Sequence, residues 1–268
     1  MEKVLIVCVN YNSYEELNNY LLSINNSAST TQGRNQVDVI VADNSIKKQN
    51  LELNCFSHIS VKLVRLENSG YLGGAQRIIN DVENIYQYDY VAISNVDIEL
   101  SSNFFENLLK YQLDKDIAWI ATRIWSKAEE RDRNPKIISR PSKKRLQIVN
   151  LMYRFPILDY LYTKTLYKRK AMYMPSPEMD IFAGHGSFMM LTRHFFEHYK
   201  KIEYPIFLFG EEIYLGELIR LSGMRVRYVP SLEVIDMEHA STGKMKKAFY
   251  YKCNNESIEY ILDHFYNE

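Results

Sequence analysis

An aspartate stands where a hydrophobic segment of this sequence ends. The run YDYVAIS, residues 88–94, predicts a buried strand, and Asn95, Val96 and Asp97 follow it. A carboxylate beside an amide oxygen suits Mg²⁺ or Mn²⁺, which prefer oxygen ligands and keep coordination positions open for a substrate. An ion held there would neutralise a diphosphate group. The alternative is structural, with Asp97 or Ser101 capping the helix that comes next.

Two acids and a histidine further along the chain are candidates for proton transfer and metal binding. Glu211 and Glu212 open a helical pattern directly after the apolar residues 207–209. Apolar neighbours would desolvate one carboxylate and raise its pKa toward that of a general base. The helix dipole alone also favours two acids at this position. His239 is either a neutral imidazole ligand of a metal or an ordinary loop histidine.

Polar residues also end the earlier apolar runs. Asp43 is placed to accept a hydrogen bond from a nucleoside base or a ribose, although Asp-Asn-Ser is also common in turns. The stretch NSGYLGGAQRIIN, residues 68–80, has three glycines ahead of a helix, so the backbone can approach a ligand, and Arg77 is placed to reach phosphate. The stretch matches neither the G-x-G-x-x-G pattern nor a Walker loop, which excludes both fingerprints.

Alternating strands and helices must position these residues. The continuous apolar run at 3–9 predicts a strand buried on both faces, and further buried strands are expected at 37–42, 61–66 and 88–94. Helical patterns separate them, one after Ser13 and one near 73–86, so we expect a parallel, doubly wound sheet. Ligands bind beyond the carboxyl ends of such strands. The polar ends would therefore share one edge: Asn10–Asn12, Asp43–Ser45, Asn68–Gly70 and Asn95–Asp97.

The second half of the chain predicts further elements around the acid pair. An apolar strand follows the glycines and histidine of residues 184–186, and the helix from Glu211 should stop at Gly223. A strand near 224–230 and an amphipathic C-terminal helix come last.

Composition excludes several classes of protein. The 268 residues are 46% hydrophobic, with 33 basic and 33 acidic side chains, so a full core is possible and no global charge predicts nucleic-acid binding. Three dispersed cysteines fit a reducing cytoplasm better than a disulfide framework or a zinc site. The apolar run at residues 4–9 is too short for a signal peptide or a membrane span.

Residues 127–172 differ from the rest in charge. They carry thirteen Lys or Arg against four acids, and an apolar, aromatic-rich stretch runs through them. One interpretation is a solvated insertion packed on the core. The other is a surface that meets anionic lipid headgroups or an acceptor bearing a diphosphate, which predicts peripheral membrane contact.

Taken in order, these motifs resemble the family 2 glycosyltransferases with the GT-A fold, in particular the rhamnosyltransferase-like branch that builds bacterial surface polysaccharides. The resemblance covers residues 3–245 without the basic middle. The matching stretches are VNYNS at 9–13, VADNS at 41–45, ENSGYLGGAQRIIN at 67–80, SNVD at 94–97, FAGHGSFMML at 182–191, FLFGEEIYLGELIRLSG at 207–223 and YVPSLEVIDMEHAST at 228–242.

The resemblance implies roles for particular residues. Asp97 and His239 match the metal site, and Glu212 matches the acid of a Glu-Asp pair that deprotonates the acceptor, with Glu211 beside it. The expected nucleotide-sugar contacts, from the resemblance and the polar strand ends together, are Asn10, Asn12, Asp43, Asn68, Gly70, Arg77 and Asn95. Three positions depart from the family pattern: Asn95 replaces the first acid of D-x-D, Glu212 replaces aspartate, and Cys253-Asn254 replaces an Arg-Asn pair.

We therefore expect an α/β fold of the GT-A type, with a single doubly wound, mostly parallel sheet flanked by helices and a basic helical insertion. One domain, residues 1–268, would comprise a nucleotide-binding half (1–100), the basic insertion (127–172), an acceptor and catalytic half (173–245) and a C-terminal helix (246–268).

The resemblance predicts an inverting glycosyltransferase that uses Mn²⁺ or Mg²⁺ and a nucleotide-diphosphate sugar. Its acceptor would be lipid-linked or a polysaccharide, and the protein would be cytoplasmic or peripheral on the inner membrane face. Two alternatives remain open. A sugar-1-phosphate nucleotidyltransferase is disfavoured because VNYNSYEE contains no glycine or lysine, and a degenerate sugar-nucleotide-binding partner is allowed by Asn95.

Overall fold

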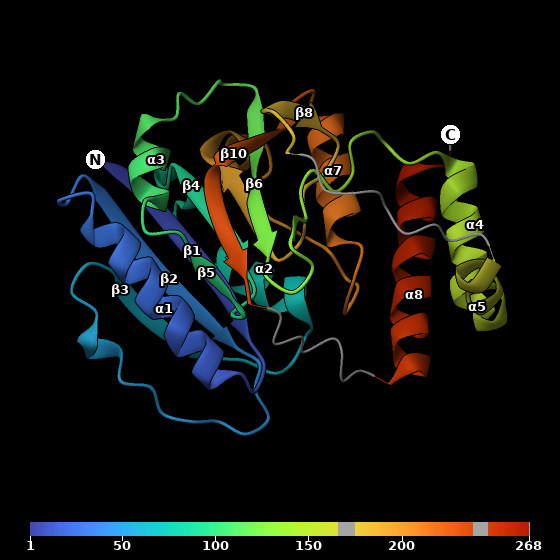
Figure 1. The fold of residues 1–268 in the computed structure, drawn as a ribbon, viewed down its shortest axis with the longest axis horizontal. Coiled ribbons are helices and arrows are strands. Elements are labelled where there is room, and N and C mark those ends of the chain that lie inside the picture. Colours follow the sequence, from blue (N-terminus) through green and yellow to red (C-terminus); the bar gives the residue numbers. More distant parts are fainter. Residues whose placement is uncertain (166–174, 238–245, 268) are drawn as a thin grey trace.

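A mixed ten-stranded sheet forms the centre of the computed structural model, which describes residues 1–165, 175–237 and 246–267. Along the main path the described strands follow the order β3-β2-β1-β4-β9-β6-β10-β5, while β7 pairs with β6 and β8 with β10 (Figure 1). The strands are β1 (Glu2–Asn10), β2 (Asn35–Asp43), β3 (Ser60–Arg65), β4 (Tyr90–Ser94), β5 (Ile98–Leu100), β6 (Ile117–Ser126), β7 (Arg131–Asp132), β8 (Met179–Ile181), β9 (Phe188–Thr192) and β10 (Arg225–Asp236).

Helices cover both faces of the sheet. Those described are α1 (Tyr14–Ser29), α2 (Tyr71–Asp81), α3 (Phe104–Lys110), α4 (Lys143–Arg154), α5 (Pro156–Thr165), α6 (Arg193–His198), α7 (Glu211–Leu221) and α8 (Lys247–Phe265), with short 3₁₀ turns at Leu53–Cys55 and Ile85–Gln87. Alternate residues of β1 enter two different cores: Leu5 and Val7 pack with α2, α6 and α7, whereas Val4, Ile6 and Cys8 pack with α1 and α3. This two-sided burial explains the continuous apolar runs in the sequence.

The first half of the sheet has the predicted parallel arrangement. Strands β3, β2, β1 and β4 run parallel, so their carboxyl ends share one edge. The second half differs from the expected mostly parallel sheet, because β9 inserts antiparallel between β4 and β6, and β10 pairs antiparallel with both β5 and β8. Ser13 precedes α1 as predicted, but its side chain makes no capping hydrogen bond.

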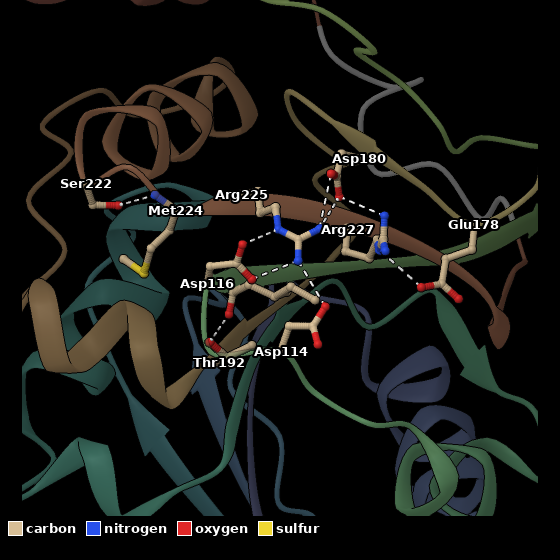
Figure 2. Close-up of polar contacts among 10 residues, drawn as sticks. Asp114, Asp116, Glu178, Asp180, Thr192, Ser222, Met224, Arg225 and Arg227 are labelled. Carbon is tan, nitrogen blue, oxygen red and sulfur yellow. Dashed lines mark hydrogen bonds and ion pairs between the residues drawn. The ribbon is translucent and has the colours of Figure 1, made fainter.

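Ion pairs fasten the start of β10 to its surroundings. Arg225 contacts Asp114 and Asp116, which precede β6, and Asp180 on β8, at 3.0, 2.6 and 3.1 Å (Figure 2). Arg227 on the same strand also contacts Asp180, at 3.0 Å. The aspartates are largely exposed, so solvent screens each contact and none of them alone contributes much to stability. Together they fix where β10 begins.

Within its described part, residues 127–165, the basic segment is helical only from Lys143 to Thr165. Its first part, residues 127–142, contains β7 and then runs beside the sheet, where the Ile137 and Ala183 backbones exchange hydrogen bonds of 3.1 Å. Helices α4 and α5 pack together and α4 lies along α8, forming one end of the molecule (Figure 1). In the described ranges, 1–165, 175–237 and 246–267, no helix has the length and hydrophobicity that crossing a bilayer requires.

An arginine anchors the approach to α4. Arg140 pairs with the fully buried Glu217 of α7 at 2.7 Å and stacks on the ring of Tyr266 at 4.0 Å. Its guanidinium also donates to the Phe265 carbonyl at 2.8 Å, at the end of α8. These contacts hold the chain before α4 against the two helices that flank the candidate site.

Candidate functional site

The end of β1 and the end of β2 share a closed hydrogen-bond network. Asn10 Nδ2 donates to Asp43 Oδ1 and to Ser45 Oγ, each at 3.1 Å, and Tyr14 Oη donates to Asp43 Oδ2 at 2.8 Å. Asn10 and Asp43 are fully buried. The structure therefore brings these predicted residues together, but both carboxylate oxygens of Asp43 already accept protein donors. These donors do not exhaust the carboxylate, but Asp43 is so buried that a ligand would reach it only after the network rearranges.

Asn12 lies at the exposed rim of this network. Its backbone N–H donates to Ser45 Oγ at 2.8 Å and its side-chain oxygen accepts from Lys47 N–H at 3.1 Å. The backbone of Asn12 is left-handed, with φ of 57°, a conformation that asparagine tolerates better than most residues. This turn directs the chain from β1 into α1.

The loop after β3 approaches the acid-bearing segment closely. Asn44 Nδ2 donates to the Gly70 carbonyl at 2.9 Å, and the exposed Asn68 accepts from Gly70 N–H at 3.1 Å. Gly70 has φ of 86°, and a Cβ there would overlap the carbonyl oxygen of Phe207. Only glycine allows both the turn and the contact. Arg77 lies exposed on α2, and no ion pair to it is found among the described residues.

Asp97 lies at the same edge, beyond β4. Burial raises its pKa, while the nearby charge of Arg133 and a hydrogen bond from the Asn95 side chain act in the opposite direction. Arg133 itself pairs with Asp236 at 2.7 Å. The Asp97 carbonyl accepts a hydrogen bond of 3.1 Å from the N–H of Met237. Met237 is the last described residue before the gap at 238–245. His239 therefore lies outside the described residues.

The oxygen groups at this edge suit a divalent ion held largely by a substrate. Within the part of the chain that the structure describes, no group of three or more His, Cys, Asp or Glu side chains could hold a metal. Mg²⁺ commonly uses only one or two protein carboxylates together with phosphate oxygens. Asp97, half-buried and next to the Asn95 amide, fits that pattern.

A strained turn presents Glu211 and Glu212 at the start of α7. Phe209 and Gly210 have φ of 70° and 80°, so both residues are left-handed. Tyr204 Oη donates to the Phe209 carbonyl at 2.7 Å and lies 3.3 Å from Ser257 Oγ of α8. A Cβ on Gly210 would overlap Ser257 Oγ and come within 2.5 Å of Tyr204 Oη. The turn is thus clamped between a buried tyrosine and α8.

The two acids differ in acidity because their partners differ. Glu212 Oε1 accepts from Lys136 Nζ at 2.6 Å and from Gly186 N–H at 3.1 Å. Burial acts to raise the pKa of Glu212, but the charge of Lys136 and these hydrogen bonds bring it below its usual value. Burial and the neighbouring Glu212 charge raise the pKa of Glu211 well above its usual value. These opposite directions make Glu212 the more acidic member of the pair.

Residues 185–187 join the acid pair to the strand edge. Tyr71 Oη donates to the Gly186 carbonyl at 2.6 Å, while Asn95 N–H donates to the Ser187 carbonyl at 2.9 Å. Burial raises the pKa of Tyr71, and the negative charges of Glu211, Glu212 and Asp97 raise it further. The metal candidate and the acid candidates therefore face one region.

A buried histidine completes this connection. Burial, reinforced by the nearby Lys136 charge, lowers the pKa of His185 to about 3, so the ring is neutral. Its Nδ1 accepts from Ser187 N–H at 3.2 Å, and its backbone N–H donates to Asn134 Oδ1 at 2.9 Å. His185 thus supports the loop rather than offering a proton donor near neutral pH.

Similarity to known proteins is visible in structure rather than in sequence. No protein-family model and no curated protein matches the chain. A crystal structure of GalNAc-T7 with UDP, GalNAc and Mn²⁺ aligns with a TM-score of 0.60 and 14% identity, covering 99% of this chain and 50% of that one. A crystal structure of S. aureus TarS, residues 1–349, aligns with a TM-score of 0.55 and 9% identity, covering 98% of this chain and 72% of that one. Both are GT-A glycosyltransferases.

The chain has the GT-A fold. It spans half the length of the GalNAc-T7 chain that it matches. The predicted α/β class is therefore confirmed, whereas identities this low leave the activity, the substrates and the rhamnosyltransferase-like branch as proposals.

Sequence reasoning missed three residues of this candidate site: Tyr71, Lys136 and His185. Tyr71 was part of a recognised motif but carried no assigned role. Lys136 lies 76 residues from Glu212 in the sequence, inside the basic segment that the resemblance excludes. The glycines flanking His185 were the only local signal that it belongs to the site.

Proposed function

We propose that the chain is an inverting glycosyltransferase that moves a sugar from a nucleotide-diphosphate donor to an acceptor hydroxyl. One observation carries the proposal. On a GT-A fold, an acid pair with Lys136 bound to Glu212 lies next to residues 185–187, which also form a backbone hydrogen bond to Asn95 at the polar edge of the parallel strands. In-line displacement requires a base on one side of the anomeric carbon of the sugar and the diphosphate leaving group on the other side.

Glu212 is the better base of the pair. Lys136 and Gly186 engage its Oε1, whereas its Oε2 has no hydrogen-bond partner among the described residues. Being ionised, it can take the proton of the acceptor hydroxyl as that oxygen bonds to the anomeric carbon. The bond between the anomeric carbon and the diphosphate breaks at the same time, and the nucleoside diphosphate leaves with the electron pair. Glu211 remains protonated beside it.

Asp97, with the Asn95 amide nearby and His239 in the undescribed segment, would hold Mn²⁺ or Mg²⁺ together with the donor diphosphate. When bound, the ion supplies positive charge for the leaving group. The rim residues Asn12, Asn68 and Arg77, with the network of Asn10 and Asp43 behind them, would bind the nucleotide sugar. Gly70 lets the loop come close.

Calorimetric titration tests this proposal directly. UDP, dTDP and GDP are titrated with Mn²⁺ or with EDTA into the wild type, Asp97→Ala and the control Asp81→Ala, which removes an exposed acid at the end of α2. We expect metal-dependent binding of one nucleotide, lost only in Asp97→Ala. Binding of none of the three would contradict the proposal.

Turnover then separates the alternatives. A transferase releases the nucleoside diphosphate from its sugar nucleotide, and Glu212→Gln should abolish that release while nucleotide binding persists. Binding without any turnover would favour the degenerate partner. Formation of nucleoside triphosphate from a sugar nucleotide and pyrophosphate would favour the nucleotidyltransferase.

The finer assignment concerns the acceptor. We place the chain in bacterial surface-polysaccharide synthesis, transferring a hexose or deoxyhexose at the cytoplasmic membrane face to a lipid-linked or polysaccharide acceptor. The support is a surface of α4 and α5 where exposed apolar residues lie among basic ones. Its apolar members are Ile148, Leu151, Phe155, Ile157 and Tyr160, and its basic members are Lys143, Lys144, Arg154 and Lys164.

Cosedimentation with vesicles tests the membrane assignment. Leu151→Ser should weaken binding to phosphatidylglycerol vesicles, and 1 M salt should weaken it further because charge attraction is screened. Leu22→Ser is the control, since Leu22 is similarly exposed on α1. Equal binding by both variants would contradict the assignment.

A further inference from the structure

A cavity of about 650 Å³ lies between α4, α8 and the turn that presents the acid pair. Figure 1 shows α4 and α8 side by side at one end of the molecule, with α7 next to them. Glu211 and Glu212 form part of the cavity wall, so its occupant would meet the proposed base. The volume falls within the ~300–1,000 Å³ typical of sites for small molecules.

The cavity wall is cationic on one side. Lys136 and Arg145 both line it. Lys136 is paired with Glu212, whereas no carboxylate within residues 1–165, 175–237 and 246–267 pairs with Arg145. A guanidinium presents a planar set of donors that matches phosphate oxygens. Arg145 is therefore the group in this wall with unused capacity for an anion.

The remaining wall is aromatic and aliphatic. Tyr153 of α4 and Tyr250 of α8 meet edge to face with ring centroids 6.0 Å apart, and both line the cavity. Leu146, Val149 and Ile258 lie beside them. Tyrosine rings offer an apolar face for the C–H side of a sugar ring and a hydroxyl for its polar edge. The lining thus combines a phosphate-binding cation with a surface suited to a sugar.

We propose that this cavity binds the acceptor as a phosphate-bearing sugar, with its phosphate on Arg145 and its reactive hydroxyl at Glu212. The inference rests on the proposed function, because it assumes that Glu212 activates a hydroxyl. It goes further by naming the acceptor class and placing its recognition on α4, a helix outside every motif of the sequence resemblance.

Helix α4 supplies a matched control. Residues 145, 146, 149 and 153 share one face at helical spacing and line the cavity, whereas 144, 148 and 151 lie on the opposite face and do not line it. Arg145 and Lys144 are both exposed, so they differ in position rather than in exposure. Arg145→Gln and Lys144→Gln each remove one positive charge from the same turn of this helix. Only Arg145→Gln removes it from the cavity.

Ligand-observed NMR competition measures the consequence. The probes are the 1-phosphates of glucose, galactose, mannose, N-acetylglucosamine and N-acetylgalactosamine, with the corresponding free sugars for comparison. At least one sugar phosphate should bind the wild type more tightly than its free sugar. Arg145→Gln should weaken that binding about tenfold or more, and Lys144→Gln should change it less than about twofold.

Three outcomes would overturn the proposal: no sugar phosphate binds, free sugars bind equally well, or both charge variants lose affinity alike. Phosphatidylglycerol vesicles distinguish a headgroup from a sugar phosphate. A loss of vesicle binding in Arg145→Gln with no loss of sugar-phosphate binding would assign Arg145 to lipid and refute the cavity site.

UDP, dTDP and GDP titrations on the wild type and the same variants separate the cavity inference from the proposed function. Nucleotide binding without sugar-phosphate binding removes only the cavity inference, whereas failure of the wild type to bind any of the three nucleotides removes the proposed function.

Discussion

Replacing Gly210 with alanine tests whether α8 holds the turn beneath the acid pair. Gly210 has φ of 80°, and its missing Cβ leaves the room that Ser257 Oγ and Tyr204 Oη occupy. An L-residue in the left-handed region costs ~1–2 kcal/mol. Overpacking adds ~1–3 kcal/mol, and disturbing the hydrogen bond from Tyr204 to the Phe209 carbonyl adds ~0.5–1.5 kcal/mol. We therefore expect Gly210→Ala to lower the free energy of unfolding by about 3–6 kcal/mol.

The other end of the same helix provides the control. Gly223 follows α7 and has φ of 73°, but no atom lies within 4 Å of the position that its Cβ would take. Gly223→Ala should therefore cost only the conformational part, about 1–2 kcal/mol. The difference between the two variants isolates the contact with α8.

Urea denaturation measures both variants. Tryptophan fluorescence reports on β6, where both tryptophans of the chain lie, and far-ultraviolet circular dichroism reports on the helices, so coincident transitions check two-state behaviour. Adding Ser257→Ala removes the nearest obstructing atom and should reduce the cost of Gly210→Ala by at least about 1 kcal/mol in a double-mutant cycle. Equal costs at Gly210 and Gly223, or no coupling to Ser257, would refute the clamped turn.

Two further predictions follow from the ion pairs. Arg140→Met should lower the free energy of unfolding by about 2–3 kcal/mol because it removes a partner from the fully buried Glu217. Arg123→Met removes a partly exposed ion pair and should change the free energy of unfolding by less than about 1 kcal/mol. Urea denaturation compares the two variants, and equal effects would contradict the argument. The Lys136 charge lowers the pKa of Glu212 even though burial acts to raise it. Lys136→Met removes that charge, so the acidic limb of the kcat/KM pH profile should move to higher pH. Lys136→Arg keeps the charge and should leave the acidic limb in place. An unchanged acidic limb in Lys136→Met would exclude Glu212 as the group that must be ionised.

Local sequence patterns predicted the half of the fold that local physics determines. Four predicted segments became β1, β2, β3 and β4. Strands β1 and β4 are buried on both faces and are apolar at most positions, whereas β3 lies at the edge of the sheet with no buried residue, so the expected burial of β3 was wrong. The polar ends of these four strands met at one edge because parallel strands share a direction. Helix α7 begins at Glu211 as expected, since its acids favour the N-terminus, and its last residue lies two positions before Gly223.

Long-range pairing was not visible in the sequence. Strand β6 is a buried apolar segment like the others, but nothing local indicates that β9 runs antiparallel beside it. The contact between Lys136 and Glu212 depends on residues 133–139 lying along the strand edge, which backbone hydrogen bonds to distant residues determine. The hydrogen bond from Tyr14 to Asp43 was not predictable either, because Tyr14 is the first residue of α1 and lies 29 positions from Asp43 in the sequence.

Helix α4 has unusual freedom to change. Of its 12 residues, only Leu146 is fully buried, and Val149 and Tyr153 pack partly against the core. Arg145, which lines the cavity, is exposed, so changing it creates no void in the core and should have little effect on folding. The acid pair has no such freedom, because the turn before it is wedged between a buried tyrosine and α8. A lineage with this scaffold can therefore diverge in what the α4 cavity admits by mutating one helix surface while the reacting groups stay in place. Selection on acceptor choice and selection on chemistry would act on separate residues.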